Sequence, residues 1–107
     1  MKKELRLVEE FHRKFRAPVG AVPTLISEER SKLRYKLMKE EVEEYLTDGV
    51  NCSGTKNKKI SNIAKELADI LYTVYGTILE HGLQDKMEEI FLENHKLQMS
   101  KSYTPVK

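Results

Sequence analysis

The absence of proline between residues 24 and 104, most of the 107-residue chain, is the feature that most constrains the fold. Pro18, Pro23 and Pro105 all lie outside this stretch, so long helices are permitted within it. The period-two alternation that is typical of strands never persists along the chain. We therefore expect an all-α fold.

Four stretches repeat apolar residues at the three- and four-residue steps of a helix. The first covers about residues 3–15. The second begins after Ser27, a good N-cap, and runs to about residue 47, where Asp48-Gly49 is expected to end it. The third covers about residues 60–81 and stops before Gly82. Asp85-x-x-Glu88 then resembles a capping box that opens a fourth helix, to about residue 100.

Four helices with short connections favour an antiparallel four-helix bundle in a single domain of residues 1–107, with a frayed tail at about 101–107. The polar segment 50–59 is predicted to be a loop, in which Lys56, Lys58 and Lys59 are either solvated or part of a lid over bound phosphates. The third helix has more apolar surface than one small bundle can cover, which predicts self-association.

The composition excludes several classes of protein. Charged residues make up 34% of the chain and hydrophobic residues 39%, a balance typical of globular proteins. A net charge of +2 is too small to indicate nucleic-acid binding, and no apolar run is long enough to span a membrane. Because nothing resembles a signal peptide, we expect a cytoplasmic protein. The single Cys52 excludes an intramolecular disulfide and a cysteine-based zinc site.

The third helix contains an unusual carboxylate. From Leu67 to Leu79 the sequence reads LADILYTVYGTIL, with Asp69 as its only charged residue. A helix that is apolar nearly all round is buried, so we expect Asp69 to be buried, and Glu66 shares its face three residues earlier. A buried carboxylate is costly unless it is protonated, paired or bound to a metal ion.

The second helix carries matching carboxylates. Glu41 falls inside its apolar stripe, Glu44 lies one turn further along, and Glu40 lies four residues before Glu44. If these residues face Glu66 and Asp69, the repulsion among them favours an all-oxygen site for Mg²⁺ or Mn²⁺. The alternative is neutralisation by ion pairs with Arg34 or Lys65. A di-iron site is disfavoured, because it needs two Glu-x-x-His motifs and only Glu9-x-x-His12 fits.

The spacing Glu40-Glu41-x-x-Glu44, followed on the next helix by Glu66-x-x-Asp69, resembles the motif of the all-α nucleoside triphosphate pyrophosphohydrolases. The similarity extends over nearly the whole chain. The segments Val8-Glu9-Glu10-Phe11-His12 and His95-Lys96-x-x-Met99-Ser100-Lys101 resemble the branch that contains MazG-like proteins and phosphoribosyl-ATP pyrophosphohydrolase.

This resemblance implies Mg²⁺-dependent hydrolysis of a nucleoside triphosphate to the monophosphate and pyrophosphate, by a homodimer or homotetramer. It implies that the metal ions bind to Glu41, Glu44, Glu66 and Asp69. Glu40 would then hold a second ion or orient the attacking water. The substrate would be bound by residues that include Arg34, Lys96, Gln98 and Lys101. Gln98 stands where members of this branch carry asparagine, and its amide reaches one methylene further.

Two further classes stay open at the level of the sequence. A catalytically silent helical module could bind a nucleotide or a protein partner, although binding alone would not need all five carboxylates. A purely structural bundle would be stabilised by removal of the charge of Asp69. Release of pyrophosphate in the presence of Mg²⁺ distinguishes the enzyme from both.

Overall fold

A computed structural model describes residues 1–101, so the predicted frayed tail at 101–107 lies almost wholly outside the described residues. In chain order the elements are helix α1 (Lys2–Lys14), helix α2 (Glu28–Glu44), a π-helix η1 (Tyr45–Val50), helix α3 (Lys56–Glu80) and helix α4 (Met87–Met99). Helices and no strands are present in residues 1–101, which confirms the predicted all-α fold.

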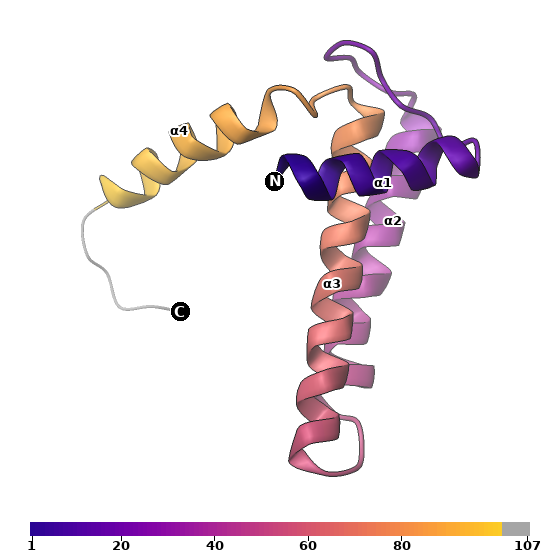
Figure 1. The fold of residues 1–107 in the computed structure, drawn as a ribbon, viewed down its shortest axis with the longest axis vertical. Coiled ribbons are helices and arrows are strands. Elements are labelled where there is room, and N and C mark those ends of the chain that lie inside the picture. The colour runs from indigo at the N-terminus through magenta and orange to yellow at the C-terminus, as the bar shows by residue number, and fades with distance from the viewer. Residues whose placement is uncertain (102–107) are drawn as a thin grey trace.

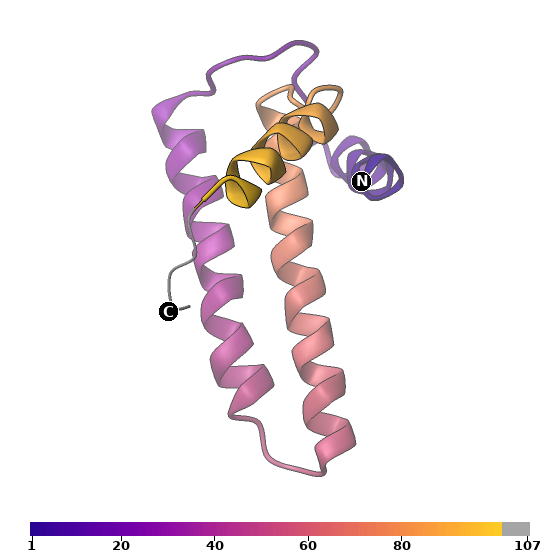
Figure 2. The same cartoon turned by 90° about the vertical axis from the view of Figure 1, so that its left-hand side faces the viewer.

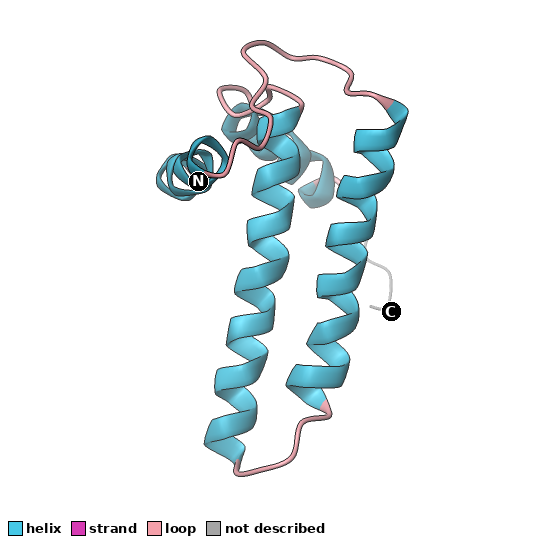
Figure 3. Ribbon diagram, turned by 90° about the vertical axis from the view of Figure 1, so that its right-hand side faces the viewer, coloured by secondary structure: helices cyan, strands magenta, loops and turns pink. Residues whose placement is uncertain are grey.

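Helices α2 and α3 lie side by side and antiparallel, as two long arms of a hairpin (Figure 2 and Figure 3). The π-helix η1 continues α2 without a break into the turn at one end of this hairpin. Helix α1 crosses α3 near its opposite end, and α4 points away from the other helices (Figure 1). The hairpin therefore brings together residues of α2 and α3 that are far apart in the sequence.

Local signals explain some of the helix boundaries. Ser27 caps α2, because its hydroxyl accepts a hydrogen bond from the Arg30 backbone N–H at 3.1 Å, as predicted. Helix α3 ends just before Gly82, as predicted. Gly82 has a φ of +66°, and a Cβ there would collide with the Val22 carbonyl.

Two predicted helix starts are wrong. The hydroxyl of Thr55 accepts a hydrogen bond from the Lys58 N–H at 3.2 Å, so α3 begins at Lys56, earlier than the expected residue 60. The three lysines that were assigned to a loop thus lie in the first turns of α3. The capping box at Asp85 is absent, since Lys86 is the N-cap of α4 and its side chain makes no capping hydrogen bond.

The apolar core described in residues 1–101 is small and lies where α1 crosses α3. It consists of Leu5 and Val8 from α1, packed against Ile78 and Leu79 from α3. No residue of α4 is buried within the described part of the chain. Part of the remaining apolar surface of α3 is also uncovered, since Leu67 and Leu71 are exposed.

This exposure overturns one expectation about α3. The Asp69 side chain is 39% exposed, so the prediction that it is buried is wrong. The apolar pattern around α3 is real, but the single chain leaves part of that surface uncovered. None of the helices described here is both long and apolar enough to cross a bilayer.

Candidate functional site

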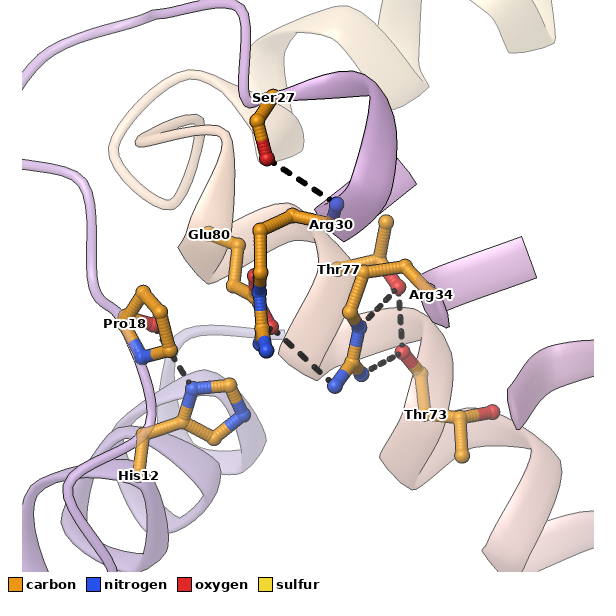
Figure 4. A network of polar contacts seen from close by, with 8 residues as sticks. All are labelled: His12, Pro18, Ser27, Arg30, Arg34, Thr73, Thr77 and Glu80. Carbon is orange, nitrogen blue, oxygen red and sulfur yellow. Dashed lines mark hydrogen bonds and ion pairs between the residues drawn. The ribbon is translucent and has the colours of Figure 1, made fainter. Parts of the chain in front are cut away.

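The contact between α2 and α3 carries charged side chains near both of its ends. At the end near α1, two arginines of α2 meet a glutamate of α3 (Figure 4). At the end near η1, carboxylates from both helices approach one another. The two ends therefore hold opposite charge balances.

Glu80 is the centre of the first group. Its side chain is completely buried and accepts two hydrogen bonds from Arg30, at 3.0 Å from Nε and 2.7 Å from Nη2. Arg34 Nη1 lies 3.3 Å from the same carboxylate. This charge-assisted bonding satisfies a group that would otherwise be costly to bury.

Arg34 is held by three partners in this network. Besides Glu80, its guanidinium donates to Thr77 Oγ1 at 3.1 Å and to the Thr73 carbonyl at 2.9 Å (Figure 4). Burial lowers the pKa of Arg34, and the charge of Glu80 opposes that shift. The structure places Arg34, a predicted substrate-binding residue, in an internal network with Glu80, Thr73 and Thr77.

Gly76 allows α1, α2 and α3 to approach closely at this network. A Cβ at this position would lie 2.5 Å from Arg34 Nη2 and 2.8 Å from His12 Nε2. The His12 ring is buried and its Nδ1 lies 3.0 Å from the Pro18 carbonyl oxygen (Figure 4). Glycine is therefore the residue that lets an arginine and a histidine pack against the α3 backbone.

The second group contains all four predicted metal ligands. Oxygens of Glu41, Glu66 and Asp69 lie within 4.8 Å of one another. A second set, again within 4.8 Å, is formed by Glu44, Asp48 and Glu66. Glu66 belongs to both sets and thus joins them into one cluster, the carboxylate cluster, which consists of Glu41, Glu44, Asp48, Glu66 and Asp69.

Asp48, whose position next to Gly49 suggests a helix stop, is a member of the cluster that was not predicted. The spacing does contain the signal, because Asp48 follows Glu44 by four residues on a continuing helix. The π-helix η1 carries it. Gly49 lets η1 pack closely on α3, since a Cβ there would lie 3.3 Å from the Ile63 Cα.

Two oxygens in the carboxylate cluster are buried without a partner. The Glu66 side chain is only 6% exposed, and neither its Oε2 nor Glu41 Oε2 has a hydrogen-bond partner among residues 1–101. Burial raises the pKa of Glu41, and so do the neighbouring carboxylates, of which Glu44 has the largest effect. The cluster therefore lacks positive charge in its interior.

Lys65 lies at the edge of this cluster. Its Nζ is 3.0 Å from Asp69 Oδ2 and 3.5 Å from Glu66 Oε1, and its side chain is 68% exposed. The hydrogen bond to Asp69 and the charges of both carboxylates raise the pKa of Lys65. Lys65 thus forms the ion pair that was the alternative to a metal site, but it neutralises only the solvent-facing side of the cluster.

The other predicted site residues lie apart from the carboxylate cluster. Glu40 is exposed, and its carboxylate is 3.9 Å from Lys36 Nζ. Lys96 pairs with Glu93 on α4. Beyond α4, Lys101 Nζ donates to Gln98 Oε1 at 2.9 Å. Because α4 points away from the hairpin, one chain does not bring Lys96, Gln98 or Lys101 to the cluster (Figure 1).

Comparison with known proteins agrees with this geometry. The family model described as phosphoribosyl-ATP pyrophosphohydrolase matches residues 8–105, most of the chain. A search of curated proteins finds no match. The matched range includes every residue of the carboxylate cluster, and it confirms the resemblance that the spacing of those residues indicated. The chain therefore belongs to the phosphoribosyl-ATP pyrophosphohydrolase family, a family of metal-dependent enzymes that act on nucleotides.

Proposed function

We propose that this protein is a nucleotide pyrophosphohydrolase that cleaves a nucleoside triphosphate to its monophosphate and pyrophosphate, with Mg²⁺ or Mn²⁺ held between α2 and α3. The observation that carries this proposal is the buried Glu66, whose Oε2 has no partner in residues 1–101 although it lies among four other carboxylates. A buried carboxylate surrounded by others of the same charge needs a compensating cation.

The donor set fits a hard divalent cation. It consists of carboxylate oxygens from two helices, which Mg²⁺ and Mn²⁺ prefer to nitrogen or sulfur ligands. Glu41, Glu66 and Asp69 would hold one ion, and Glu44 and Asp48 would share Glu66 in holding another. The packing of η1 and α2 on α3 brings each of the two groups of oxygens together.

When bound, the metal lowers the pKa of a ligated water and neutralises phosphate oxygens. The residues of the chain would then orient that water and remove its proton. Glu40 remains our candidate for this base, since it adjoins Glu41 in the chain and its carboxylate is tied to Lys36 only by a long, exposed contact of 3.9 Å. Arg34 is left out of the substrate site, because its side chain is only 9% exposed and its guanidinium already contacts Glu80, Thr73 and Thr77.

Substrate contacts from α4 require a second copy of the chain. The exposed apolar residues of α3 and α4 support a homodimer or homotetramer, and they include Leu67, Leu71, Phe91, Leu92 and Leu97. In such an assembly α4 of one copy would reach the hairpin of another. Lys96 and Lys101 would then bind phosphates, and Gln98 would contact the base or the ribose.

The test is release of pyrophosphate from a panel of NTPs, dNTPs and phosphoribosyl-ATP, each with Mg²⁺, with Mn²⁺ and with EDTA. We expect metal-dependent turnover that Glu66→Gln abolishes. Glu43→Gln on the exposed side of α2 serves as the matched control and should retain activity. Absence of turnover on every substrate would support the alternative, a silent nucleotide- or protein-binding module.

A further inference from the structure

Lys65 provides the positive charge closest to the carboxylate cluster. Among the described residues, it is the only cation within 4.0 Å of a member of the cluster. Its ammonium contacts Asp69 Oδ2 and Glu66 Oε1, whereas Glu66 Oε2 and Glu41 Oε2 face the interior without partners. The lysine thus neutralises the outer side of the cluster and leaves the inner side uncompensated.

The ion pair between Lys65 and Asp69 is weak and can be broken easily. Lys65 and Asp69 lie four residues apart on one exposed face of α3, and such pairs contribute little to stability. The lysine side chain is mostly solvated, so no packing holds the ammonium in place. By contrast, the arginines at the other end of the hairpin are tied to a completely buried glutamate.

We propose that Lys65 acts as an internal counter-ion that competes with a divalent cation for the carboxylate of Asp69, and so sets the affinity of the site for metal. This inference rests on the proposed function, because it concerns the same carboxylates. In the absence of metal the ammonium holds Asp69 Oδ2. A divalent ion that takes Asp69 as a ligand displaces the ammonium into solvent.

Competition of this kind predicts that metal binds more tightly when the lysine charge is removed. An exposed ion pair of this type corresponds to about a twofold to fivefold change in a binding constant. Lys65→Met should therefore bind Mn²⁺ about twofold to fivefold more tightly than the wild type. Lys65→Arg keeps the charge and should bind Mn²⁺ with nearly the wild-type affinity.

Isothermal titration calorimetry of the full chain with Mn²⁺ alone measures these affinities. Lys32→Met is the matched control, since Lys32 forms an exposed pair with Glu28, four residues away, at 3.1 Å. It removes the same charge from the molecule at a distance from the cluster. The control should bind Mn²⁺ as the wild type does, which separates local competition from the change in net charge.

The possible outcomes separate this inference from the proposed function. Tighter binding by Lys65→Met, with wild-type binding by Lys65→Arg and Lys32→Met, supports the competition. If Lys65→Met and Lys32→Met bind Mn²⁺ equally well, the counter-ion role is wrong and the metal site stands. If the wild type binds no more Mn²⁺ than Glu66→Gln does, both the metal site and the role of Lys65 are wrong.

Discussion

Arg34 Nη1 lies 3.3 Å from Glu80 Oε2, and the two side chains are 9% and 0% exposed. This contact joins α2 to α3 at a point where neither charge can be solvated. Arg30 adds a second guanidinium to the same carboxylate. Three charges in one network, of which only Arg30 is partly exposed, are stable together, but each depends on the others.

We expect Glu80→Gln to destabilise the protein strongly, by about 3–5 kcal/mol, because it leaves a buried guanidinium without a counter-charge. Urea unfolding of the metal-free protein measures the loss. Glu28→Gln is the matched control, since it removes an exposed glutamate that pairs with Lys32, and it should change stability by less than about 1 kcal/mol. Equal effects of the two substitutions would contradict a structural role for the network.

Gly76→Ala should also destabilise the fold, although alanine is the better helix former by about 1 kcal/mol. The new methyl group would lie 2.5 Å from Arg34 Nη2, so the arginine or α1 must move, at a cost of about 1–3 kcal/mol. Thermal unfolding measures this change. Ser61→Ala on the exposed side of the same helix controls for helix propensity, and a Gly76→Ala protein as stable as that control would refute the close approach.

The metal-free stability should depend on pH through Glu41, whose pKa is raised above its ordinary value of 4.5 by burial and by its neighbours. Such a group takes up a proton more readily in the folded state, so its charge weakens the fold at neutral pH and the effect disappears as the pH falls toward 4.5. In EDTA, we therefore expect Glu41→Gln to be more stable than the wild type at neutral pH, with a difference that shrinks on acidification. Urea unfolding across this range measures it, and a difference independent of pH would be evidence against the shift.

Mg²⁺ should raise the melting temperature of the wild type, because an ion that binds only the folded state stabilises it by mass action. At a tenfold excess over the dissociation constant the gain is about 1.4 kcal/mol, and each kcal/mol corresponds to about 4–8 °C for a small domain. Differential scanning fluorimetry with and without EDTA checks this. Glu66→Gln should lose the shift and Glu43→Gln should keep it. An identical shift in both variants would place the bound ion elsewhere.

Self-association should depend on the uncovered face of α3. Leu71 is exposed and lines an apolar groove of about 190 Å³ between α1 and α3. We expect Leu71→Glu to shift the protein toward monomers in sedimentation velocity, since it places a charge in the contact. Leu25→Glu in the loop before α2 introduces the same charge on an exposed leucine and should leave the assembly unchanged. A wild-type chain that sediments as a monomer would exclude the proposed dimer and tetramer.

The parts of the fold that could be predicted from the sequence are those set by neighbouring residues. Ser27 and Gly82 mark helix ends through local backbone chemistry, and both were identified. The spacing of Glu41, Glu44, Glu66 and Asp69 also identifies one face of each helix. Because α2 and α3 are antiparallel and joined by a short turn, these faces meet as predicted.

The remainder depends on contacts between distant residues or on surface that the single chain leaves uncovered. The pairing of Arg34 with Glu80 joins two helices, and nothing in the local sequence around either residue indicates the other. Asp69 lies in an apolar segment, yet its burial requires a cover that one chain does not supply. Asp48 was missed because Gly49 suggested a helix end, whereas the helix continues as a π-helix.

The two ends of the α2–α3 hairpin meet the same electrostatic demand by different means. Glu80 receives its positive charge from arginines that are part of the chain, so the alignment of the arms needs nothing from solution. The carboxylates near η1 outnumber the lysine beside them, so their neutralisation depends on what the surrounding liquid contains. The hairpin thus has an open end whose charges are balanced within the chain, and a turn end whose charge balance responds to dissolved cations.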